Sequence, residues 1–100
     1  MIIKNILAQL KEATRPISKI IKAGDSFKSM AIGLKKGIIW RDHKAVMPTK
    51  LMVAEGKVIY RQGESNIELG KFDDLDIPID IVHSLEAEED SICILIQGSN

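Results

Sequence analysis

The hydrophobic pattern of the chain has two parts, which meet at Pro16. Before it, apolar side chains recur at helical spacing with polar side chains between them: Ile2, Ile3, Ile6, Leu7 and Leu10. Proline cannot continue a helix, because it lacks a backbone N–H, so the pattern predicts one short helix that ends near Thr14. We expect this helix to cover the open side of a sheet. A helix that binds a partner or a membrane surface is the alternative.

After Pro16 the pattern changes to short apolar runs separated by polar and glycine-containing turns. Met30, Ile32 and Leu34 alternate with other residues, as in a strand with one buried face. Similar runs predict strands at residues 17–23, 27–34, 38–40, 50–54, 57–62, 65–69, 75–77, 82–87 and 91–97. Gly56 and Gly63 can adopt the positive φ that tight hairpin turns require.

Many short strands with turns at roughly 8–12-residue spacing are typical of an antiparallel sandwich or barrel. The sequence therefore predicts an all-β fold with one short N-terminal helix. We expect a single domain over residues 1–100, with the helix in residues 1–15 and the barrel in residues 16–100. Only 4% of the residues are aromatic, so Ile, Leu and Val must fill most of the core.

The composition also bears on where the protein works. No apolar run approaches the roughly 20 residues that a membrane-spanning helix needs. The N-terminal residues lack the features of a signal peptide. The single cysteine, Cys93, cannot form an internal disulfide. These features predict a cytoplasmic protein that does not contact membranes.

The charges are unevenly distributed, although the formal net charge is zero. Residues 1–50 contain 11 Lys or Arg and 3 Asp or Glu, a balance of +8, and residues 51–100 contain 3 and 11, a balance of −8. A basic half could attract nucleic acid, but its lysines are scattered and no aromatic platform accompanies them. We therefore expect no nucleic-acid partner. The two halves would instead neutralise each other within the fold or across a homodimer.

Two stretches of the sequence resemble the conserved blocks of the cupin superfamily, whose members are small antiparallel jelly-roll barrels. In the first stretch Gly37 is followed after five residues by His43-Lys44-Ala45, and six residues separate Thr49 from Gly56. The second contains Phe72-Asp73, Pro78, His83 and Ala87 at the corresponding places, and the tail from His83 to the last strand is also similar. The resemblance spans roughly residues 26–97. It implies a cupin barrel and, by analogy with the family, a homodimer.

The resemblance also implies where a metal ion would bind. Cupin metal sites use three histidines and one glutamate to hold iron, manganese, nickel or zinc. This chain has His43 and His83 at two of these places, and Ala45 and Thr49 at the other two. Alanine cannot coordinate a metal, and a threonine hydroxyl is a poor ligand. We therefore predict no metal cofactor; the alternative is a divalent transition metal held by His43 and His83 with help from water or a carboxylate.

The candidate pocket is the mouth of the expected barrel, where strand alternation would place His43, Thr49, Leu51, Val53 and His83. Trp40, Met47, Met52 and Tyr60 are the bulky side chains nearby, and we interpret them as barrel filling or dimer surface rather than pocket lining. Cys93 lies inside an apolar strand and is interpreted as a buried structural thiol.

Three classes of function remain open. The first, which we favour, is a metal-free barrel that binds a small ligand or has a structural or regulatory role. The second is an enzyme: a metal-dependent oxygenase or isomerase, or a metal-free acid–base catalyst that uses His43 and His83. The third is a sensing module that binds a small effector and acts through another protein. No catalytic residue is assigned.

Overall fold

The computed structural model describes residues 1–98, apart from the side chain of Asp42. One helix, α1 (Ile2–Leu10), precedes nine strands. The strands are β1 (Ile17–Ala23), β2 (Phe27–Leu34), β3 (Ile39–His43), β4 (Thr49–Glu55), β5 (Lys57–Gln62), β6 (Ser65–Gly70), β7 (Asp74–Ile77), β8 (His83–Ala87) and β9 (Ser91–Gly98). The predicted all-β fold with one short N-terminal helix is confirmed, and the strands lie close to their predicted positions.

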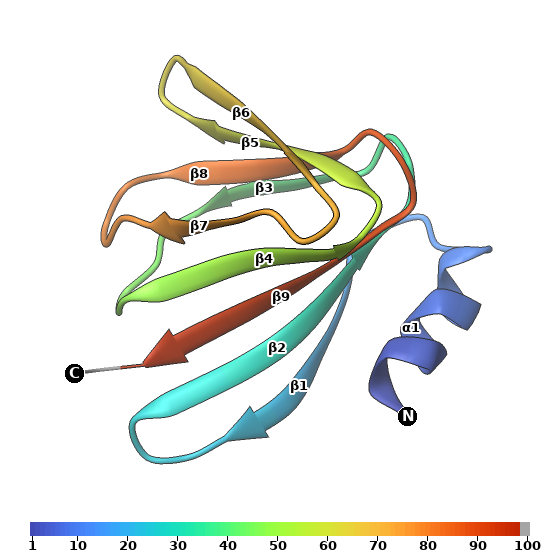
Figure 1. Ribbon diagram of the computed structural model, residues 1–100, viewed down its shortest axis with the longest axis horizontal. Helices are drawn as coiled ribbons and strands as arrows, with labels where there is room; N and C mark the ends of the chain where they lie inside the picture. Colours follow the sequence, from blue (N-terminus) through green and yellow to red (C-terminus); the bar gives the residue numbers. More distant parts are fainter. Residues whose placement is uncertain (99–100) are drawn as a thin grey trace.

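The strands form two facing antiparallel sheets (Figure 1). The five-stranded sheet has the order β1-β2-β9-β4-β7, and the four-stranded sheet has the order β3-β8-β5-β6. Apart from the β1–β2 and β5–β6 pairs, neighbouring strands are distant in sequence, as in β4–β9 and β3–β8. This crossing of the chain between sheets brings the ends of β3, β7 and β9 to the same side of the barrel as the starts of β4 and β8 (Figure 1).

Alternation along the strands produces the hydrophobic core between the sheets. In β4, the burial pattern alternates between buried and partly buried side chains, so that Thr49, Leu51 and Val53 face inward. The core is aliphatic, with one tyrosine and one cysteine: Ile32, Leu34, Ala45, Leu51, Val53, Val58, Tyr60, Leu69, Ile77, Leu85, Ala87, Cys93 and Leu95. The expectation that aliphatic residues fill the interior is therefore confirmed.

The helix packs on the outer face of the five-stranded sheet, where it covers β1, β2 and β9. Ile6 and Leu10 form a second apolar cluster with Ala31 and Ile92. Gly33 allows this close approach, because a Cβ there would lie 2.4 Å from a methyl carbon of Ile6. The helix thus covers a sheet, as expected, rather than leaving its apolar face to a partner. No helix among the described residues is long and apolar enough to cross a membrane.

The helix ends at Leu10, earlier than the predicted end near Thr14. The ammonium of Lys35, from the turn after β2, donates hydrogen bonds to the carbonyl oxygens of Leu10 at 3.3 Å and Lys11 at 2.7 Å. A cation at this end satisfies carbonyl groups that have no partner inside the helix and complements the helix dipole. This cap is made by a residue distant in sequence, so the local pattern could not predict it.

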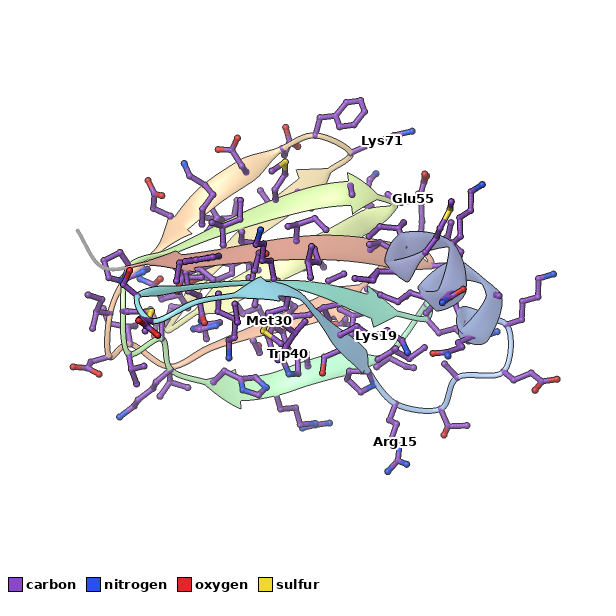
Figure 2. The ribbon with its side chains drawn as sticks, turned by 90° about the horizontal axis from the view of Figure 1, so that it is seen from below. Arg15, Lys19, Met30, Trp40, Glu55 and Lys71 are labelled. Atoms are coloured by element: carbon purple, nitrogen blue, oxygen red, sulfur yellow. The ribbon has the colours of Figure 1, made fainter. Side chains whose placement is uncertain are left out.

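Some of the opposite charges meet on the outer surface. Lys50 of β4 lies 3.7 Å from a carboxylate oxygen of Asp74 and 3.2 Å from one of Asp76, both on β7. At the same sheet's other end, Lys71 lies 3.6 Å from Glu55 (Figure 2). The contacts of Lys50 join the basic and acidic halves of the sequence within one sheet. Arg15 and Lys19, in contrast, lie on the β1 side of the molecule (Figure 2).

Candidate ligand-binding cavity

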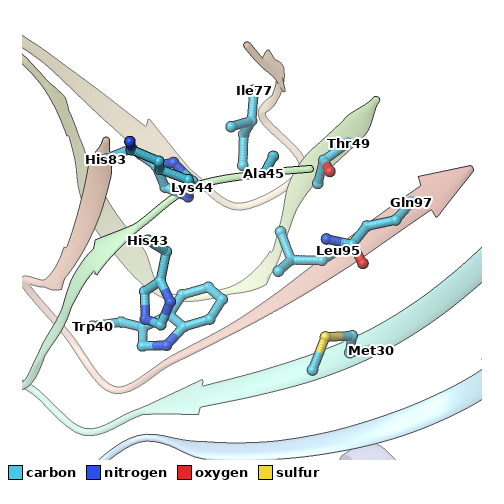
Figure 3. Close-up of a pocket in the computed structure, with 10 residues that line it drawn as sticks. All are labelled: Met30, Trp40, His43, Lys44, Ala45, Thr49, Ile77, His83, Leu95 and Gln97. Atoms are coloured by element: carbon cyan, nitrogen blue, oxygen red, sulfur yellow. The ribbon is translucent and has the colours of Figure 1, made fainter. Parts of the chain in front are cut away.

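A cavity of about 110 Å³ lies between the two sheets at one end of the barrel. Its lining combines apolar and polar side chains: Met30, Trp40, His43, Lys44, Ala45, Thr49, Ile77, His83, Leu95 and Gln97. Figure 3 shows Trp40 and His43 on one side of this cavity and Thr49, Leu95 and Gln97 on the other. Met30 lies on β2 of the five-stranded sheet and Trp40 on β3 of the four-stranded sheet, so the two sheets both contribute apolar lining.

The strand register explains why these residues meet. In the five-stranded sheet, Thr49 pairs with Ile77 on one side and with Gln97 on the other, which places three lining residues in one row. In the four-stranded sheet, His43 pairs with His83. Because residues that pair directly across antiparallel strands lie on the same face, both rows point into the space between the sheets. The cavity is therefore built by long-range register.

The two histidines form part of a line of rings along the inner face of the four-stranded sheet. The ring centroids of Trp40 and His43 are 4.2 Å apart, those of His43 and His83 are 6.5 Å apart, and those of His83 and Tyr60 are 5.6 Å apart. The Tyr60 hydroxyl donates to Oε1 of Gln62 at 2.9 Å, and burial raises the pKa of Tyr60. Tyr60 therefore stays neutral and supports one face of the His83 ring.

His83 is held in a defined orientation. Its side chain is buried, and its Nδ1 lies 3.3 Å from the carbonyl oxygen of Ile81. A carbonyl can only accept a hydrogen bond, so Nδ1 carries the proton in this contact. In the neutral ring, Nε2 then has the lone pair and can accept a proton or a hydrogen bond.

Thr49 and Ala45 occupy the places where the cupin blocks have metal ligands. The hydroxyl of Thr49 donates to the carbonyl oxygen of Met47 at 2.9 Å, so its oxygen can only accept from a ligand. Ala45 is 4% exposed and presents a methyl group. Its backbone is fixed by a bridge to Ile79 and by a hydrogen bond from the Asp80 N–H to its carbonyl at 2.9 Å.

These residues do not fit the metal ion that the cupin motif implies. Within residues 1–98, the side chains that the structure describes contain no group of three or more His, Cys, Asp or Glu that could hold a metal ion. The two imidazoles would supply two ligands, and the methyl of Ala45 would supply none. The prediction that no metal is the cofactor stays a prediction, but the chemistry of the donor set supports it.

The structure brings His43, Thr49 and His83 together around the cavity, as the sequence suggested. Leu51 and Val53, the other two candidate residues, are fully buried in the hydrophobic core and do not line the cavity. They share the inward face of β4 with Thr49, but they follow it along the strand. Alternation correctly identifies the face, whereas it cannot say where along the strand packing ends and the cavity begins.

Several lining residues were missed by the sequence analysis. Gln97 lies on the same face of β9 as Leu95, and it becomes a cavity residue only because it pairs with Thr49. Lys44 adjoins His43 in sequence and lies at the exposed rim. Of the bulky residues interpreted as barrel filling, Trp40 does line the cavity, while Tyr60 supports His83 from the core. Knowledge of the β4–β9 register would have identified Gln97.

We compared the sequence and the structure with those of known proteins. No protein-family model matches the sequence, and no curated protein is significantly similar to it. Solved structures are similar in three dimensions. A cupin superfamily protein from Desulfitobacterium hafniense has a TM-score of 0.81 at 18% identity, covering 94% of this chain and 88% of that one. A conserved protein of unknown function from Streptococcus pyogenes has a TM-score of 0.79 at 16% identity, covering 89% and 78%.

The similar structures also include a lyase. The DMSP lyase of Ruegeria pomeroyi has a TM-score of 0.78 at 13% identity, and the match covers 86% of this chain but 48% of the lyase. At these identities the likeness concerns the fold. The chain has the cupin fold, which the sequence motifs predicted, and its relatives in structure include both enzymes and proteins of unknown function.

Proposed function

We propose that this protein binds a small molecule in the cavity between its two sheets, without the help of a metal ion. The observation that carries the proposal is the lining itself. Polar groups from both sheets converge on a space bounded by Met30, Trp40, Ile77 and Leu95, a combination that is typical of ligand sites. At the positions of two metal ligands the chain has a methyl group and a hydroxyl already bonded to the backbone.

The size of the cavity limits the ligand. An apolar cavity of about 150 Å³ accommodates benzene, so a space of about 110 Å³ suits a molecule, or the buried part of one, of roughly six non-hydrogen atoms or fewer. A larger ligand would have to extend past the exposed residues at the rim, such as Lys44.

The experiment is a thermal-shift screen of small metabolites against protein that was purified without chelator and analysed for bound metals. We expect ligands that raise Tm equally with and without EDTA, because binding to the folded state alone stabilises it. The matched control is Ala45→Leu, which fills the cavity from its wall, with the more flexible Ala45→Met as a second variant. Both should fold by circular dichroism and lose the Tm shift.

Two outcomes would contradict the proposal. One is a near-stoichiometric transition metal in the wild-type protein that disappears in the His43→Ala/His83→Ala double variant. The other is a ligand whose Tm shift persists in correctly folded Ala45→Leu and Ala45→Met, since binding would then occur elsewhere.

A second candidate function is metal-free acid–base catalysis by the two histidines. The observation in its favour is the pairing of His43 with His83 across β3 and β8, with Nε2 of His83 able to accept a proton. If the site is catalytic, a ligand from the screen should be converted, and His83→Gln should abolish turnover while Tm still responds to that ligand. Binding without conversion would leave the protein a binding module.

The assembly and location are also proposals. We propose a homodimer, supported by the exposed apolar side chains of Ile20 and Ile21 on edge strand β1 and of Phe27 beside it. Sedimentation analysis at micromolar concentration tests it, and a monomer would contradict it. The free, buried Cys93 is compatible with the reducing cytoplasm that we propose as its location.

A further inference from the structure

We infer that the ligand of this cavity is a small organic carboxylate with a short apolar part. The inference deepens the proposed function and depends on it, because it assumes that the cavity binds a ligand. It names the class of ligand from the charges and surfaces of the lining residues.

Among the lining residues that the structure describes, the ionisable side chains are all basic. His43, Lys44 and His83 line the cavity, and no Asp or Glu is among the described lining residues. Lysine is cationic at neutral pH, so Lys44 presents a positive charge to a ligand in the cavity. A bound cation would be repelled by the ammonium of Lys44, whereas an anion would be attracted to it.

Lys44 is available to such an anion. Among the described side chains, no carboxylate lies within ion-pair distance of its ammonium, whereas Lys50, Lys57 and Lys71 each have an acidic partner. Lys44 is exposed at the rim, and its flexible stem lets the ammonium follow a ligand whose charged end is at the mouth. Hydrogen bonds between ammonium and carboxylate are stronger than those between neutral groups.

The remaining lining distinguishes a carboxylate from a fully polar anion. Met30, Trp40, Ile77 and Leu95 present apolar surface from both sheets. Inorganic phosphate would lose its hydration against this surface without gaining partners there, and burying an unpaired charge is costly. A molecule with one charged end and an aliphatic part matches both halves of the lining. Gln97 adds an amide N–H₂ that can donate to the carboxylate.

The test compares three molecules of nearly equal size and shape by isothermal titration calorimetry: butanoate, butanamide and butylammonium. We expect butanoate to bind more tightly than the other two, and inorganic phosphate to bind more weakly than butanoate. Raising the salt concentration should weaken butanoate binding, because the rim is exposed and its ion pairs are screened.

Variants of Lys44 test whether the positive charge at the rim is responsible for the affinity for butanoate. Lys44→Met keeps most of the stem and removes the charge, and it should weaken butanoate binding by about tenfold or more. Lys44→Arg should retain most of the affinity. Lys19→Met changes the net charge by the same amount on β1, outside the cavity lining, and should leave the affinity unchanged.

The outcomes separate this inference from the proposed function. If butanamide or butylammonium binds as tightly as butanoate and Ala45→Leu abolishes that binding, the carboxylate class is wrong and cavity binding stands. Absence of butanoate binding to the wild-type protein overturns the carboxylate inference, while the metabolite screen still decides the proposed function. Equal loss of affinity in Lys44→Met and Lys19→Met would show a general charge effect and would also overturn it.

Discussion

The two ends of the barrel interior are built from the same strands and have opposite characters. On β4, Thr49 borders the cavity at one end, while Val53 is fully buried near the other. On β8, His83 borders the cavity, and Ala87 lies in the core. The packed end is closed by apolar side chains, and the cavity end combines histidines, a lysine and an amide. Side chains alternate between the two faces of each strand at both ends. The difference in polarity between the ends therefore comes from which residue types occupy the inward-facing positions.

This comparison indicates how one small barrel combines stability and binding. Packing at one end supplies the buried area that stabilises folding. At the other end the side chains leave a cavity that is lined in part by polar groups. Substitutions at the packed end should therefore affect the free energy of unfolding, whereas substitutions at the cavity end should affect ligand binding more than stability.

The largest effect is expected at the packed centre of β4. Leu51→Ala removes a fully buried side chain and should lower the free energy of unfolding by about 2–5 kcal/mol, measured by urea denaturation. A loss below about 1 kcal/mol would mean that Leu51 is not tightly packed. It would contradict the account in which the cavity is confined to the other end of the barrel.

The turns at the two ends should respond differently to the same substitution. At the packed end, Gly56 has φ +84°, and a Cβ would lie 2.4 Å from the carbonyl oxygen of Asp90. Gly56→Ala should cost about 2 kcal/mol or more in unfolding free energy, since strain and a backbone clash add.

Gly63 is the matched control for this turn at the cavity end. It has φ +57°, and a Cβ there would have no atom within 4 Å other than those of its own residue and its two chain neighbours. Gly63→Ala should cost only about 1 kcal/mol, from the left-handed backbone alone. Equal losses for both variants would contradict the tight packing assigned to the Gly56 turn.

An exchange of nearly isosteric residues on β4 compares the two ends directly. Val53→Thr places a hydroxyl in the apolar core and should cost about 1–3 kcal/mol. Thr49→Val removes one hydrogen bond to Met47 and should cost about 1 kcal/mol or less. The free energy of unfolding is measured for each single variant. A larger loss for Thr49→Val than for Val53→Thr would contradict the assignment of Val53 to the packed end and Thr49 to the cavity end.

The most gradual effect is a dependence on alkaline pH at the packed end. Burial raises the pKa of Cys93 from 9.0 to about 12. Between these values the unfolded chain releases the thiol proton while the folded chain keeps it, so stability should fall as pH rises above about 9. The slope due to this group is at most about 1.4 kcal/mol per pH unit.

The difference in unfolding free energy between wild type and Cys93→Ala, followed from pH 8 to pH 10.5, isolates this contribution from other alkaline groups. It should be constant below about pH 9 and change above it as the wild type loses stability. A difference that stays constant over the whole range would show that the thiol titrates normally in the folded protein.

The sequence predicts the fold of this protein better than its site, for physical reasons. Each strand has a local signature, such as the alternation of Met30, Ile32 and Leu34 or the turn glycine at Gly56, and these signatures agree with the long-range likeness to cupin motifs. The cavity depends on how strands pair. Gln97 joins it through its register with Thr49, and neither residue carries a local sign of that contact.

The sequence also does not predict where along a strand the core ends and the cavity begins. Thr49, Leu51 and Val53 occupy equivalent positions of one alternating pattern, yet only Thr49 lines the cavity. The filling at the other two positions depends on side chains from the facing sheet. The helix end at Leu10 is a third example, because its cap comes from Lys35, on the other side of two strands.

The most direct test of the difference between the two ends is an NMR titration of ¹⁵N-labelled protein with butanoate. The account predicts that amide shifts change at the cavity end, at Lys44, Thr49, His83 and Gln97, and stay constant around Val53 and Ala87. Changes concentrated at the packed end or on the outer face would contradict it. The absence of any change at millimolar butanoate would contradict the ligand class and would leave the metabolite screen as the test of the cavity.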